Sequence, residues 1–89
     1  MTRSISIIAG EITMDMITQS LHSKKKLTWQ NKYPYAAPYV TAMSTMDKIS
    51  DPFYLDSGSE IVNRFLCNAT HWRGDTAKRI KAELKAMNI

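Results

Sequence analysis

The sequence has a single cysteine, Cys67, and only three glycines among its 89 residues. One cysteine cannot form an internal disulfide, so we expect a protein of a reducing compartment, the cytoplasm. The glycines are isolated from one another, which excludes a glycine-rich phosphate-binding loop. The apolar run after Arg3 is too short for a signal peptide, and no run approaches the about 20 residues of a transmembrane helix. The sequence therefore predicts a protein without a membrane segment.

Residues that could carry chemistry are also scarce. Cys67 and His71 are the one thiol–imidazole pair at i,i+4 spacing, but a thiol catalyst also needs an oxyanion hole and a group that orients the base. A structural zinc site needs four ligands, and beyond this pair the chain adds only the distant His22. We therefore predict a non-enzymatic protein with no cofactor and no metal.

Charge is unevenly distributed along the chain, whose net charge is +4. Residues 1–36 hold five basic and two acidic side chains, residues 37–72 two and four, and residues 73–89 five and two. Basic ends around an acidic middle are compatible with ordinary solubility, or with a positive surface for nucleic acid or an acidic protein. A chain of this size forms one domain with a marginal core, so a partner or a homodimer would add stability.

The first 26 residues are ambiguous. From Ile5 to Met16, apolar and polar residues alternate around Ala9-Gly10, a pattern typical of two strands joined by a tight turn. Ile12, Met16 and Leu21 also fall at helical spacing. We favour a β-hairpin or an extended arm over residues 1–26, followed by a small helical domain over residues 27–89.

The sequence of residues 27–89 predicts a mainly α fold of three helices. After a linker over residues 23–37, apolar spacing indicates a helix from Tyr39 to Ile49. The last two helices, Ser57–Trp72 and Asp75–Met87, would form an αα-hairpin, the first of them with a capping box. We expect these helices to share a core of Met43, Met46, Phe65, Leu66, Ile80 and Leu84.

Two stretches are candidates for binding. The linker interleaves basic and aromatic residues, a combination that tracks a phosphate backbone and stacks on bases. The alternative is that the aromatics are anchors that pin a loop to the helices. The last helix carries a line of lysines, which either contact phosphates or solvate the outer face near a helix C-terminus. The candidate binding residues are Lys24, Lys25, Lys26, Trp29, Lys32, Tyr33, Tyr35, Arg73, Lys78, Lys81 and Lys85.

The segments Tyr33-Pro34-Tyr35, Phe65-Leu66-Cys67-Asn68-Ala69 and Trp72-Arg73-Gly74-Asp75-Thr76-Ala77 resemble small accessory proteins of enterobacterial phages and prophages. The resemblance extends from about Leu27 to Met87 and implies a protein that binds host or phage machinery. We predict a non-enzymatic binding protein that acts in or near nucleic-acid transactions, with nucleic acid or a host nucleic-acid-processing protein as partner. The alternative is an inhibitor or adaptor that targets a host protein without binding nucleic acid.

Overall fold

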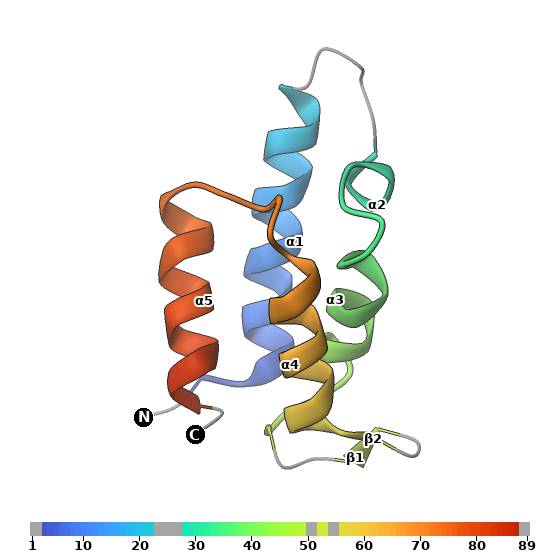
Figure 1. The fold of residues 1–89 in the computed structure, drawn as a ribbon, viewed down its shortest axis with the longest axis vertical. Helices are drawn as coiled ribbons and strands as arrows, with labels where there is room; N and C mark the ends of the chain where they lie inside the picture. Colours follow the sequence, from blue (N-terminus) through green and yellow to red (C-terminus); the bar gives the residue numbers. More distant parts are fainter. Residues whose placement is uncertain (1–2, 23–27, 50–51, 54–55, 88–89) are drawn as a thin grey trace.

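A computed structural model describes residues 3–22, 28–49, 52–53 and 56–87 of the chain. In chain order (Figure 1), these form α1 (Ile5–Leu21), α2 (Trp29–Lys32), α3 (Ala37–Met43), β1 (Pro52–Phe53), β2 (Asp56–Ser57), α4 (Gly58–Asn68) and α5 (Asp75–Met87). The two short strands pair antiparallel before α4. The prediction of a mainly helical domain is confirmed.

The predicted N-terminal β-hairpin is wrong, because α1 is a continuous helix and the longest of those described. Ile5, Ile8, Ile12 and Met16 recur at helical spacing along it, and all four are fully buried. Ala9-Gly10, the expected turn, lies in the middle of the helix. As a helix the segment packs against α2, α3 and α5 at once, whereas a lone hairpin is marginally stable. Tertiary packing therefore overrides the local alternation.

Two of the three predicted helices are shorter than expected. The helix expected from Tyr39 to Ile49 is α3, which ends at Met43. The hydroxyls of Ser44 and Thr45 donate to the carbonyls of Thr41 and Ala42, at 2.5 and 2.8 Å. Such bonds compete with the backbone ladder that would continue the helix.

The helix expected from Ser57 to Trp72 is α4, which ends at Asn68. Its start is as predicted, since the Ser57 hydroxyl accepts a hydrogen bond from the Glu60 amide at 3.2 Å. Its early end allows the chain to turn and insert the Trp72 side chain, which is fully buried. The linker also contains a short helix, α2, whose N-cap Thr28 accepts from the amide of Asn31.

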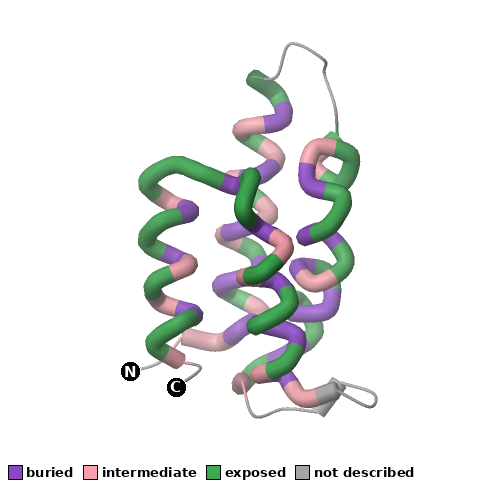
Figure 2. Tube along the Cα trace, in the orientation of Figure 1, coloured by how far each residue is buried: buried purple, intermediate pink, exposed green. Residues whose placement is uncertain are grey.

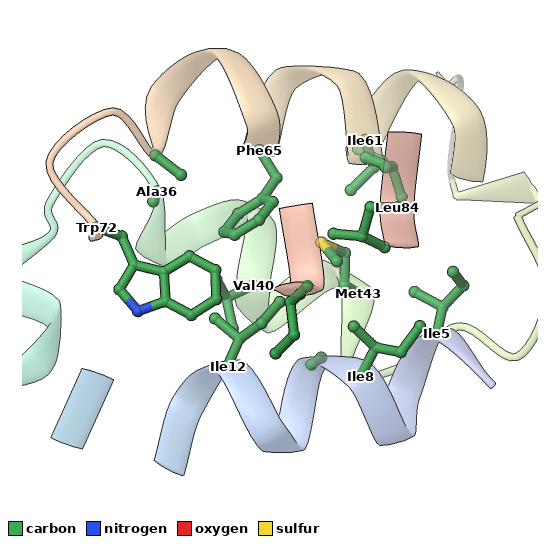
Figure 3. Packing of buried hydrophobic residues seen from close by; sticks show 14 of the residues in the cluster. Ile5, Ile8, Ile12, Ala36, Val40, Met43, Ile61, Phe65, Trp72 and Leu84 are labelled. Atoms are coloured by element: carbon green, nitrogen blue, oxygen red, sulfur yellow. The ribbon is translucent and has the colours of Figure 1, made fainter. Parts of the chain in front are cut away.

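The core lies between α1 and α4, with α3 and α5 closing it (Figure 3). Side chains from Ile5, Ile8 and Ile12 of α1 point towards α4, and Leu84 of α5 lies between the two helices. Phe65 meets Trp72 with ring centroids 5.9 Å apart and planes tilted by 60°. Of the six core residues expected from the sequence, five are buried and Leu66 packs at the edge. Figure 2 shows the same pattern, with buried positions on the inner sides of the helices.

Candidate nucleic-acid interface

The Gln19 side chain joins the two segments that contain the predicted binding residues. Its Nε2 donates to the backbone carbonyl of Arg73 at 2.9 Å, and its Oε1 accepts a hydrogen bond of 2.7 Å from the Tyr33 hydroxyl. The residues that follow α2 and the connection between α4 and α5 therefore meet beside the C-terminal half of α1, in the upper half of Figure 1.

A carboxylate beneath this junction holds Trp72 in place. Asp15 Oδ2 accepts hydrogen bonds from Trp72 Nε1 and from Gln19 Nε2, each of 2.7 Å. The indole is fully buried, and this bond satisfies its only donor. The α4–α5 connection is thus fixed to α1 by two side chains one turn apart on the same helix face.

Tyr33 is an anchor and not a stacking platform. Its side chain is 4% exposed, and its hydroxyl is engaged by Gln19. Burial, together with the negative charge of Asp15, raises the pKa of the Tyr33 hydroxyl. Lys32 Nζ lies 5.7 Å from the centroid of the Tyr33 ring, a cation–π distance.

The other linker residues differ in accessibility. Trp29 is half-buried against the core, whereas Tyr35 is 71% exposed. Lys24, Lys25 and Lys26 lie outside the described residues. Among the predicted aromatic contacts, Tyr35 is therefore the side chain that a partner reaches most easily.

Lys81 has a structural role that the spacing of the lysines Lys78, Lys81 and Lys85 on the last helix did not predict. Its Nζ donates to the carbonyls of Ala69 and Trp72, both at 2.6 Å, and lies 5.8 Å from the Trp72 ring centroid. Burial, and then the positive charges of Lys85 and Arg73, lower the pKa of the Lys81 ammonium. Lys81 thus bonds both the C-cap carbonyl of α4, which also accepts from the Trp72 amide, and a carbonyl of the connection that follows.

A shallow hollow of about 400 Å³ opens at the N-terminus of α5. It is lined by Trp72, Arg73, Gly74, Asp75, Ala77, Lys78 and Lys81. Gly74 turns the chain there with φ 117°, a conformation that strains other residues. Arg73 and Lys78 are exposed at its rim, and Lys85 is exposed farther along α5.

We call the group Lys32, Arg73, Lys78, Lys81 and Lys85 the basic face. The acidic groups that the structure places among them are Asp15 and Asp75, so five positive charges oppose two negative ones. Asp15 accepts hydrogen bonds from Trp72 and Gln19, and Asp75 lies in the first turn of α5, where the helix dipole favours a negative charge. The basic face therefore has more positive than negative groups, with Lys32 contributed by α2 and the other four by the α4–α5 connection and α5.

A separate ion cluster neutralises the remaining charges between α1 and α5. Arg3 donates to both oxygens of Glu83, at 2.9 and 2.5 Å, and to Glu11 at 2.6 Å. Arg79 pairs with the other oxygen of Glu11. The hydrogen bonds from Arg3 lower the pKa of both Glu11 and Glu83. Arg79 therefore does not belong to the basic face.

Asp15 and Gln19 were missed at the level of the sequence because residues 1–26 were assigned to a hairpin or arm. In an extended arm, Asp15 and Gln19 would also point to the same side, but they would have no neighbouring segment to bind. The signal that could have found them is their i,i+4 spacing, which places both on one face of a helix.

The thiol–imidazole pair considered above is not on one helix face. Cys67 is exposed on α4, and His71 follows the end of that helix in the connection to α5. Over the described ranges, no three of the histidine, cysteine, aspartate and glutamate side chains are grouped so that they could hold a metal ion.

No protein-family model matches the chain, and comparison with curated proteins and with solved structures likewise gives no match. The resemblance to phage accessory proteins stays a prediction. No helix in the part of the chain that the structure describes is long and apolar enough to cross a membrane.

Proposed function

We propose that this protein is a non-enzymatic binding protein that contacts nucleic acid through the basic face. The observation that supports the proposal is the junction at Gln19, which binds the Arg73 backbone and the Tyr33 hydroxyl and so joins two distant segments that carry cationic residues. The resemblance to phage proteins and the single cysteine favour an accessory role in a bacterial cytoplasm.

The proposed contacts are with phosphate groups. Arg73, Lys78 and Lys85 are exposed, and each neutralised phosphate releases condensed counterions, which favours binding at low salt. Lys81 is already bonded to two carbonyls, so its contribution is the positive potential and not a direct contact. Phosphate contacts carry no sequence information by themselves, and we therefore propose binding with little sequence preference.

Single strands are the favoured form of nucleic acid. Tyr35 is exposed and Trp29 is half-buried, so both offer part of a ring on which unpaired bases stack. A duplex hides the faces of its bases, and it would gain only the electrostatic part of the interaction.

Fluorescence anisotropy of a labelled single-stranded oligonucleotide and of a duplex of equal length tests this function. We expect binding at 50 mM salt that weakens steeply at 200 mM, with a slope of about −0.7 in log K per log salt for each phosphate contacted on the single strand. Tyr35→Ala should weaken single-strand binding more than duplex binding. Undetectable binding of both at 50 mM salt would contradict the proposal.

The second candidate is an inhibitor or adaptor that binds a host protein. The exposure of Tyr35 also suits this function, because aromatic side chains dominate the energetics of protein interfaces. Affinity purification from host lysate with and without nuclease separates the two candidates. A stoichiometric protein that survives nuclease treatment would favour the adaptor, and its loss on treatment would favour nucleic acid.

A further inference from the structure

Helix α1 has apolar side chains on two opposite faces, with polar residues on the flanks between them. Its inner face buries Ile5, Ile8, Ile12 and Met16 in the core, and in Figure 3 these isoleucines point towards α4. On the side away from the core, Ile7 is 61% exposed, Met14 65% and Leu21 78%. Contiguous exposed apolar side chains mark surfaces that interact with a partner, so this outer face is a candidate contact surface.

The residues along this outer face, all exposed except the half-buried Ile17, follow the spacing of a helix-pairing seam. Ile7, Gly10, Met14, Ile17 and Leu21 are separated by alternating steps of three and four residues, which is the a and d pattern of a coiled coil. We call these five residues the α1 stripe. At 1.5 Å per residue, it extends over about 21 Å.

We propose that the α1 stripe pairs with the same stripe of a second copy in an antiparallel, two-fold symmetric dimer. A two-fold axis beside residue 12 places Ile7 opposite Ile17 of the second copy, and Gly10 opposite Met14 of the second copy. Leu21 lies at the end of the paired region, opposite Arg3 of the second copy. A Cβ atom at Gly10 would meet nothing within 4 Å, so there is room for the long Met14 side chain. A parallel pair would set glycine against glycine and leave that space empty.

The charges beside the stripe are compatible with self-association, in which equal groups face each other. One flank carries Ser6 and Thr13, and the Thr13 hydroxyl donates to the Ala9 carbonyl. On the other flank, Glu11 is neutralised by Arg3 and Arg79 of its own chain. Two copies therefore approach without repulsion between uncompensated charges, and this flank does not favour nucleic acid as the cover.

The area of the stripe sets the expected strength of the dimer. In this register three large apolar side chains from each copy, Ile7, Met14 and Ile17, face the stripe of the other copy. Such an interface is smaller than the about 1,200–2,000 Å² that a stable complex buries. We therefore expect reversible association with a dissociation constant in the micromolar range. The stripe shares no residue with the basic face, so the dimer is proposed independently of nucleic-acid binding.

Sedimentation velocity of the full chain over a range of about 5 µM to 500 µM tests the dimer. We expect the parent protein to shift from monomer to dimer over this range. Met14→Glu places a charge in the seam and should raise the dissociation constant more than tenfold. Ala82→Glu, at an exposed position of α5, is the matched control and should associate like the parent.

Melting curves of the variants distinguish lost association from lost folding. Met14 is mostly exposed, so Met14→Glu should melt like the parent measured at a concentration where it is monomeric. If Met14→Glu does not fold, Ile7→Gln provides the same test at another exposed position of the stripe. A monomeric parent at 500 µM would overturn the proposal and leave the stripe to a different protein. Dimers that persist in the folded variants would also overturn it, because another surface would then be responsible.

The orientation is tested by oxidative cross-linking in a Cys67→Ser background. An equal mixture of Gly10→Cys and Met14→Cys chains should give mainly the mixed disulfide if the helices are antiparallel. Cross-linking of Gly10→Cys with itself, and no mixed product, would show a parallel pair and overturn the antiparallel arrangement.

Discussion

Trp72 Nε1 donates a 2.7 Å hydrogen bond to the carboxylate of Asp15, a residue 57 positions earlier in the chain. This bond ties the connection between α4 and α5 to α1, and it does so at the point where the basic face is assembled. The Phe65–Trp72 contact lies on the inner side of the same indole. A single tryptophan therefore links the core to the candidate binding surface.

Removing the acceptor should destabilise the fold. In Asp15→Ala, the buried indole loses its partner, and an unsatisfied buried donor costs about 1–3 kcal/mol. Asp15→Asn retains an acceptor oxygen and is the control, with a smaller loss. Urea denaturation followed by tryptophan fluorescence measures both. Equal stability of Asp15→Ala and the parent would mean that water replaces the carboxylate.

The core depends strongly on Phe65. The side chain is fully buried in the middle of α4, so Phe65→Ala should leave a cavity and cost about 3–5 kcal/mol. Leu66→Ala on the same helix is the control, because Leu66 is only partly buried and its loss should cost less. Thermal melting by circular dichroism gives the comparison, and the prediction fails if Phe65→Ala melts within a few degrees of the parent.

Lys81 should matter for folding more than Lys78 and Lys85 on the same helix. Lys81→Met leaves the carbonyls of Ala69 and Trp72 without their shared donor, and we expect a loss of about 1–3 kcal/mol. Lys85→Met removes an exposed charge from the same helix and should change stability by less than about 0.5 kcal/mol. Similar unfolding midpoints for the two variants would contradict the capping role of Lys81.

Acid should weaken the contact between α1 and α5. Hydrogen bonds from Arg3 lower the pKa of Glu11 and Glu83, so the folded state favours their charged forms. The resulting stabilisation is fully present above the ordinary glutamate pKa of about 4.5 and is lost as the pH falls through the lowered values. Melting temperatures from pH 7 to pH 2.5 should therefore fall for the parent and fall less for Arg3→Gln. Parallel curves would contradict this assignment.

Local signals predicted those parts of the fold that depend on local structure. The Ser57 cap and the apolar spacing of α5 gave the correct start of α4 and the correct bounds of α5. The prediction of an N-terminal β-hairpin was wrong because α1 is apolar on two opposite faces. Such a helix alternates much as a strand does, and only its packing against three other helices distinguishes the two.

The sequence predicted which residues belong to the candidate site, but not which of them are bonded within the fold and which are exposed. Sequence reasoning found the basic residues, yet it treated Tyr33 and Lys81 as equivalent to Tyr35 and Lys85. The structure separates them, because Tyr33 and Lys81 are bonded within the fold and the other two are exposed. That separation depends on Gln19 and on the connection after α4, which are contacts between distant segments.

The salt dependence of oligonucleotide binding by two charge-matched variants tests the basic face most directly. Arg73→Gln/Lys78→Gln and Lys48→Glu each lower the net charge by two, but Lys48 lies beside Ile49 and Met87, away from the hollow at the start of α5. With folding of both checked by melting curves, we expect the double variant to lose affinity and about 1.4 from the single-strand salt slope, for two lost phosphate contacts. Lys48→Glu should keep nearly the parent slope. Equal losses in the two variants would show that only the net charge matters and that the basic face is not the binding site.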